Sequence, residues 1–170
     1  MNFGTTAAIM LSIQPKWCGL IANGKKTVEV RKTKPIIKTP FKVYIYCTKD
    51  IKLRFWTGKR YSYADERSHN AFDKCGNGKV IGEFVCDAII SHCEMANADI
   101  AEQQGRIRRE ALSEYSNGKQ LYGWHISNLI IFDEPRELSE FCSPDTKQPL
   151  TRPPQSWHYV KRSVKNDEQI

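Results

Sequence analysis

The sequence predicts an α+β fold: a mixed, barrel-like β-sheet of about six strands with two or three helices. Two observations support this prediction. Short segments with strand-like alternation or continuous apolar character recur along the chain, and FKVYIYC at residues 41–47 is the clearest of them. Helical spacing occurs in few places and does not separate every pair of strands, which argues against a parallel, doubly wound sheet.

A strand and a helix are expected near the N-terminus, after a loose leader of small and polar residues at 1–9. The strand is expected at residues 11–13. The helix is expected over residues 15–23, because its opening proline suits a first helical turn and the Asn-Gly pair that follows suits a helix end.

The next segment, TVEVR at residues 27–31, alternates with period two and predicts a half-buried strand. Val28 and Val30 share one face of this strand, whereas Glu29 and Arg31 share the other. The polar face must therefore either meet solvent or line a cleft.

The connection over residues 49–78 is long for a compact domain and predicts an insertion with a function of its own. A helical stretch is expected over residues 98–117. Polar residues 163–170 are expected to form a flexible tail, so that one domain spans residues 10–162. Further strands are expected at residues 79–91, 121–132, 138–141 and 157–160.

Positive charge is concentrated in the first half of the chain, which has a net charge of +7 overall. Residues 1–79 carry 16 basic and 5 acidic residues, whereas residues 80–170 carry 10 and 14. A basic region of this kind attracts polyanions and favours contact with phosphates. The aromatic residues within and beside it suit base stacking. The charge therefore points to RNA or a nucleotide as partner. The alternative is a solvated basic face that aids only solubility.

Several classes of protein are not expected. No segment approaches the roughly 20 apolar residues of a membrane helix, and the first residues lack the features of a signal peptide. The six cysteines are scattered without a C-x-x-C pair, which predicts reduced thiols in the cytoplasm. We expect no metal and no cofactor, since Cys75, Cys86, His92 and Cys93 fit no usual zinc spacing and no phosphate-binding glycine loop occurs.

The segment GKKTVEVR at residues 24–31 fits the pattern G-x-K-x-x-E-x-R through Gly24, Lys26, Glu29 and Arg31. It resembles the signature of the ASCH family, the activating-signal-cointegrator homology domains, which are related to the PUA fold. The segments VYIYCTK, GKVIGEF, GWHISNL and DEPRELSEF extend the resemblance over roughly residues 10–142. The ending RPPQSWHYV looks like a tail of phage-associated members.

The resemblance implies a small PUA-like β-barrel with helices and a cleft beside the motif. Family members are generally regarded as RNA-binding or nucleic-acid-binding modules. A smaller subset hydrolyses the amide of acylated cytidines, using the motif lysine, a threonine at the position of the motif's glutamate, and a separate glutamate. This chain has Glu29 where that subset has threonine, and neither Glu83 nor Glu114 can be placed as the separate acid. The catalytic set is thus not reproduced.

We therefore expect a nucleic-acid-binding module whose cleft is lined by the motif. Lys26 and Arg31 are expected to contact phosphate or base acceptors, and Glu29 to orient them or to accept from a base amino group. Trp17 is expected to border the cleft, although core packing is the alternative. The expected binding residues are Gly24, Lys26, Glu29, Arg31 and Trp17, with Lys42, Lys49, Lys52 and Arg54 extending the electrostatic track.

Three alternatives stay open. The first is a hydrolase, either an amidohydrolase on acylated cytidine or a ribonuclease, with Lys26 and Glu29 as catalytic candidates. A lysine base needs a pKa lowered by burial or by a positive neighbour, whereas a nearby carboxylate keeps it charged. The second is a non-catalytic adaptor that binds a protein through residues 49–78. The third is that the motif forms only a surface ladder of ion pairs.

Overall fold

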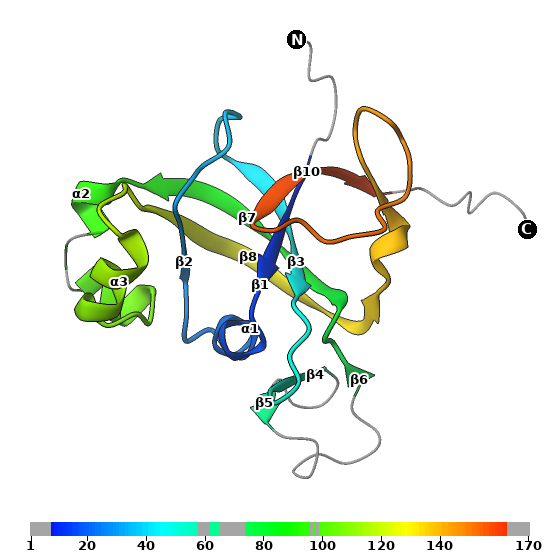
Figure 1. Ribbon diagram of the computed structural model, residues 1–170, viewed down its shortest axis with the longest axis horizontal. Helices are drawn as coiled ribbons and strands as arrows, with labels where there is room; N and C mark the ends of the chain where they lie inside the picture. The colour runs from blue at the N-terminus through cyan, green and yellow to red at the C-terminus, as the bar shows by residue number, and fades with distance from the viewer. Residues whose placement is uncertain (1–7, 58–61, 65–73, 96, 98, 163–170) are drawn as a thin grey trace, which may run out of the picture.

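The computed structural model describes residues 8–57, 62–64, 74–95, 97 and 99–162 (Figure 1). The leader, the tail and parts of the expected insertion thus lie mostly outside the described residues. The main sheet contains β1 (Ala8–Ile13), β2 (Val28–Arg31), β3 (Phe41–Cys47), β7 (Lys79–Ile90), β8 (Tyr122–Arg136), β9 (Phe141–Cys142) and β10 (Trp157–Arg162). The helices are α1 (Pro15–Ala22), α2 (His92–Met95), the π-helix η2 (Asp99–Gln104), α3 (Arg109–Ser116) and the 3-10 helix η3 (Leu138–Glu140).

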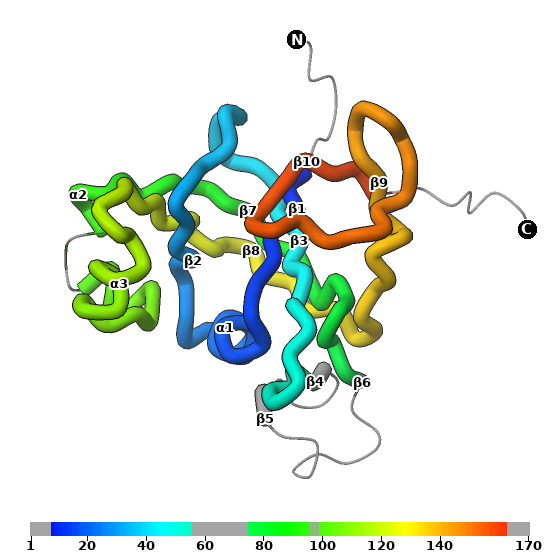
Figure 2. The backbone as a smooth tube through the Cα atoms, viewed as in Figure 1, coloured from blue at the N-terminus to red at the C-terminus, as the bar shows by residue number. Residues whose placement is uncertain are grey.

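The expected α+β class with a mixed sheet is confirmed. The seven strands follow the order β2-β8-β7-β3-β1-β10-β9. The β1–β3 pair is parallel and the other pairs are antiparallel. The edge strands β2 and β9 do not pair with each other, so the sheet curves without closing into a barrel (Figure 2).

The first strand is longer than the sequence pattern predicts, because it begins at Ala8 instead of residue 11. All six of its residues are buried, because an apolar cluster covers each face of this central strand: Ile9, Leu11 and Ile13 belong to one, and Ala8 and Met10 to the other. A strand covered on both faces shows continuous apolar character instead of alternation, which hides its start. The helix and the two strands that follow lie within one or two residues of the predicted bounds.

The helical stretch expected over residues 98–117 is divided into η2 and α3. Gly105 lies between them, where an added Cβ would come within 2.7 Å of the carbonyl oxygen of Ala101. Arg106 then adopts a φ of 57°, in the left-handed region. The chain therefore turns between the two helices, and this turn becomes part of a cavity wall.

The insertion contains a second sheet of β4 (Arg54–Thr57), β5 (Ser62–Ala64) and β6 (Lys74–Cys75), in the order β5-β4-β6. Its base is anchored in the body of the domain. Phe55 is fully buried in the main core, and its N–H donates to the side chain of Asn77 at 2.8 Å. The predicted protein-binding role of residues 49–78 stays a prediction, since much of the segment lies outside the described residues.

Three apolar clusters hold the elements together. The main cluster joins α1 to one face of the sheet and includes the fully buried Trp124. A second lies on the other face and buries Tyr44 and Tyr46, two of the aromatic residues in the basic part of the sequence, which are therefore core residues. The third packs Val28 and Val30 of β2 against α2, η2 and α3.

The structure also describes the state of the cysteines, the groups of possible metal ligands and the lengths of the helices. The six cysteines are free thiols. Within the described ranges, no group of three or more His, Cys, Asp or Glu side chains is arranged to hold a metal ion. None of the helices described there combines the length and the apolar character that crossing a bilayer requires.

Candidate functional site

A cavity of about 730 Å³ lies between α1, β2 and the turn that joins η2 to α3. Pockets that bind small molecules typically measure roughly 300–1,000 Å³, so this cavity has room for a ligand of that class. Its wall includes Trp17 and all three charged residues of the G-x-K-x-x-E-x-R motif: Lys26, Glu29 and Arg31.

The alternation of β2 directs the motif into the cavity. Val28 and Val30 are buried in the third apolar cluster, which forces Glu29 and Arg31 toward the opposite face. Gly24 precedes the strand with a φ of 70°, a left-handed conformation that glycine adopts without steric cost. The turn then presents Lys26, whose N–H donates to the carbonyl of Leu20 at 3.0 Å.

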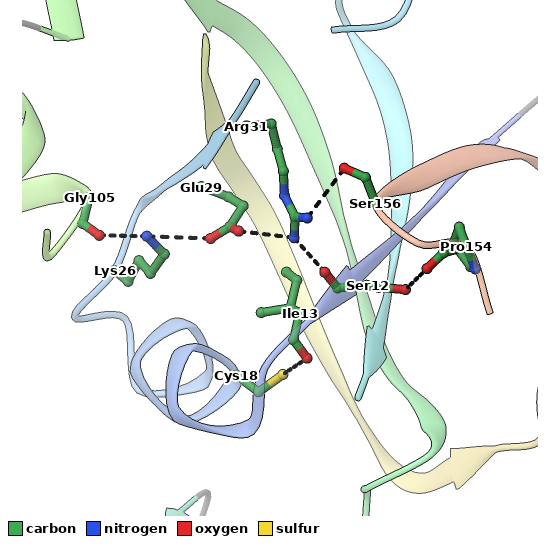
Figure 3. A network of polar contacts seen from close by, with 9 residues as sticks. All are labelled: Ser12, Ile13, Cys18, Lys26, Glu29, Arg31, Gly105, Pro154 and Ser156. Carbon is green, nitrogen blue, oxygen red and sulfur yellow. Dashed lines mark hydrogen bonds and ion pairs between the residues drawn. The ribbon is translucent and has the colours of Figure 1, made fainter. Parts of the chain in front are cut away.

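The three charged side chains form one continuous polar line (Figure 3). Lys26 Nζ lies 3.3 Å from Glu29 Oε2, and Arg31 Nη2 lies 3.1 Å from Glu29 Oε1. At one end, Lys26 Nζ donates to the carbonyl of Gly105. At the other end, the Arg31 guanidinium donates to the carbonyl of Ser12 and, at 3.5 Å, to the hydroxyl of Ser156.

This line is buried, unlike the surface ladder that the sequence left open. The exposed fractions are 1% for the Lys26 side chain, 7% for Glu29 and 11% for Arg31. Burial lowers the pKa of Lys26 because it disfavours the charged ammonium, while the Glu29 carboxylate acts in the opposite direction. The Lys26 ammonium also lies 4.9 Å from the centroid of the Trp17 ring, a distance typical of a cation–π contact.

Further hydrogen bonds attach the turn after η2 to the segment before β2. The N–H of Thr27 donates to the carbonyl of Gln104 at 2.9 Å, and Arg106 Nε donates to the carbonyl of Lys25. Together with the contact from Lys26 to Gly105, these bonds fix one wall of the cavity against the other. Lys26 is thus both a lining residue and a structural clamp.

The predicted residues outside the motif are distributed differently. Trp17 is half-buried, lines the cavity and also packs against the main core, so both of its predicted roles apply. Lys42 lies on β3 and pairs with Glu83 at 2.8 Å, away from the cavity. Lys49 and Arg54 line a separate pocket of about 310 Å³, and Lys52 is exposed beside them.

Several cavity residues were not identified from the sequence. Lys16, Arg106, Arg108 and Tyr115 all line it. The run RIRRE at residues 106–110 offers a signal, because it places basic residues directly after a glycine, but its helical spacing predicts only the start of a helix. The backbone carbonyls that accept from the motif carry no side-chain signature and could not have been found.

The family profile of the ASCH domain matches residues 11–136. Among solved structures, the chain is similar to an ASCH protein from Zymomonas mobilis, with 18% identity and a TM-score of 0.60 over 91% of this chain and 87% of that chain. A tyrosine-to-phenylalanine variant of the same protein gives 18% identity and a TM-score of 0.58, over 92% of this chain and 91% of that one. No curated protein gives a significant match. The profile covers well over half of the sequence, and this chain therefore belongs to the ASCH domain family.

Proposed function

We propose that this protein binds single-stranded RNA and takes one nucleotide of the strand into the cavity beside β2. One observation carries the proposal: the cavity combines ligand-sized volume, two aromatic side chains and an excess of positive charge. Of the residues that the structure describes, five with cationic side chains and one with a carboxylate, Glu29, line it. Cations beside aromatic rings are the usual means of holding single-stranded nucleic acid. The family's association with nucleic acid agrees with this assignment.

Glu29 is the residue best suited to recognise a base. Each of its carboxylate oxygens has one cationic partner, and a carboxylate oxygen has two lone pairs, so acceptor capacity is left for a base amino group. Tyr115 supplies a donor, because a tyrosine hydroxyl is protonated at neutral pH, and burial raises its pKa further. Lys26 holds Glu29 and the Gly105 wall in position.

The proposal is tested by fluorescence anisotropy with a labelled single-stranded RNA of mixed sequence. Affinity is expected to fall as salt is raised, since phosphate contacts release counterions. Lys26→Ala is expected to weaken binding by roughly tenfold or more, in line with about 1–3 kcal/mol for a specific contact. Glu29→Gln keeps the shape of the side chain and is expected to weaken binding similarly.

Lys25→Ala is the matched control, because Lys25 is an exposed neighbour that does not line the cavity. The affinity of Lys25→Ala for RNA is expected to stay within about twofold of the wild type, because the variant loses only an exposed charge that salt screens. Thermal melts of all variants identify any that fail to fold. Binding that is absent, or that is equally strong in Glu29→Gln, would contradict the proposal.

A second candidate function is hydrolysis, and the position of Lys26 favours it. Burial lowers the pKa of this lysine, which is the change that a lysine base requires. Chromatography of acylated cytidine, or a denaturing gel of labelled RNA, after incubation with the protein tests for turnover. Turnover that disappears in Lys26→Ala supports the hydrolase, whereas RNA that binds and remains intact supports the binding module.

A further inference from the structure

The cations that line the cavity fall into two groups. Lys26 and Arg31 of the motif are at most 11% exposed. Lys16, Arg106 and Arg108 are exposed, come from outside the motif, and form the rim of the cavity. We define these three residues as the rim cations.

The motif cations are already committed to protein partners. Lys26 contacts the Gly105 carbonyl, the Glu29 carboxylate and the Trp17 ring. Arg31 contacts Glu29 and the carbonyl of Ser12. An incoming phosphate would have to displace these partners, and breaking a buried, hydrogen-bonded ion pair is costly. The motif is therefore poorly placed to hold a phosphate, whatever else it binds.

The rim cations have fewer protein partners than the motif cations, and none of them is paired with a carboxylate among the described residues. Arg106 Nε donates to the carbonyl of Lys25, which orients the guanidinium, and no other bond of this side chain occurs among the described residues. Arg108 precedes the first turn of α3, and its side chain has no protein partner within the described part of the chain. Lys16 is exposed, and its Nζ lies over the Trp17 ring, 4.9 Å from the centroid.

Exposed guanidinium groups with free donors suit phosphate oxygens, because their planar array of N–H groups matches that geometry. The rim cations come from two elements on different sides of the cavity, α1 and the turn before α3. The same cavity is lined by Trp17 and Glu29, so a nucleotide whose base lay beside these two residues would have the rim cations within the same site.

We propose that the rim cations bind the phosphate of the nucleotide whose base enters the cavity. This inference rests on the proposed function and makes it narrower. The ligand class is a phosphorylated nucleotide, either within a strand or free, and a nucleoside without phosphate is a poor ligand. The motif then recognises the base, and the rim supplies most of the salt-dependent affinity.

The test uses the full chain, a fluorescein-labelled 12-nucleotide RNA and unlabelled competitors. Lys16→Ala with Arg108→Ala is expected to weaken RNA binding by tenfold or more. The slope of log affinity against log salt is expected to fall by about 0.7 for each phosphate of the single strand that the variant no longer neutralises. Both residues are exposed, so the variant is expected to fold.

Arg109→Ala is the matched control. It follows Arg108 directly and carries the same charge, but it lines a different pocket, with His92 and Leu112. Its affinity and salt slope are expected to match those of the wild type. An equal loss in Arg109→Ala would show that only net charge matters and would overturn the rim assignment.

Competition separates the sources of the phosphate. A mixture of the four nucleoside 5′-monophosphates that displaces the RNA supports a free nucleotide, and displacement by unlabelled RNA alone supports a strand. Displacement by the four nucleosides at the same concentration as the monophosphates would overturn the inference while leaving the proposed function intact. A wild-type protein that binds neither RNA nor nucleotides would overturn both.

Discussion

Lys26 shows how far one side chain can be understood from sequence. Strand alternation placed Glu29 and Arg31 on one face, the resemblance to the family placed Lys26 with them beside the cleft, and the structure brings the three into one polar line. The sequence could not reveal that this line is buried, because burial depends on the turn at Gly105, which lies 79 residues after Lys26 along the chain. Nor could the sequence reveal that the Lys26 ammonium donates a hydrogen bond to the backbone carbonyl of Gly105.

The buried ammonium makes stability depend on pH in a defined direction. The pKa of Lys26 is lower in the folded protein than its ordinary 10.5, so the unfolded chain binds more protons in the range just below 10.5. The free energy of unfolding therefore gains a contribution that rises with pH through this range. Lys26→Met lacks the contribution.

Denaturant unfolding at several pH values checks this prediction. The difference in unfolding free energy, wild type minus Lys26→Met, is expected to increase as pH rises toward 10.5. Subtracting the two proteins removes the titration of tyrosines, cysteines and other lysines. A difference that stays constant, or that shrinks as pH rises, would contradict the sign.

At the scale of elements, β2 and the turn between η2 and α3 act as one unit. The alternation of β2 was readable because one of its faces is apolar and the other charged. The break between η2 and α3 was not predicted, because the helical spacing of residues 106–115 hid the need for a glycine at the point where the backbone approaches Ala101. Predicting this break requires knowledge of the close approach between Gly105 and Ala101, which the spacing of apolar residues does not show.

Gly105→Ala tests the importance of this turn. The added methyl group would meet the carbonyl oxygen of Ala101 at 2.7 Å, and a backbone atom cannot move aside as a flexible side chain can. A loss of about 1–3 kcal/mol in the free energy of unfolding is expected, as for other overpacked sites. Lower RNA affinity is expected as well, since the turn carries Arg106 and accepts from Lys26.

Ser113→Ala provides the comparison for this variant. Ser113 is exposed on α3 and does not line the cavity, so its unfolding free energy is expected to stay within about 0.5 kcal/mol of the wild type. Gly105→Ala with wild-type stability and affinity would show that the turn tolerates a side chain and does not position the site.

At the scale of the whole molecule, the basic residues of the first half of the sequence do not form one surface. Lys42 pairs with Glu83, and Lys49 and Lys52 lie at the start of the insertion, outside the cavity. Counting charges shows how many positive residues the sequence has but cannot assign them to one surface. Strand pairing and the insertion place residues that are neighbours in sequence on different parts of the molecule. Their expected role as an electrostatic track stays a prediction.

Such distant charges are expected to act on association more than on the bound complex. Lys49→Gln with Lys52→Gln is expected to lower the association rate for RNA severalfold at low salt, whereas the dissociation rate stays nearly constant. Stopped-flow fluorescence at two salt concentrations measures both rates. A faster dissociation with an unchanged association rate would instead mean that these lysines touch the bound strand.

The pairing of β1 with β10 has a consequence for how the protein is made. Arg31 reaches Ser156, and the hydroxyl of Ser12 donates to the carbonyl of Pro154, so the wall near β1 depends on residues that follow more than a hundred positions later in the chain. A ribosome translating this message releases that late segment only after the helices and the motif have emerged. The wall of the cavity near β1 is thus completed only after the segment that leads into β10 has emerged, and a product truncated before Pro154 would contain the motif without these contacts.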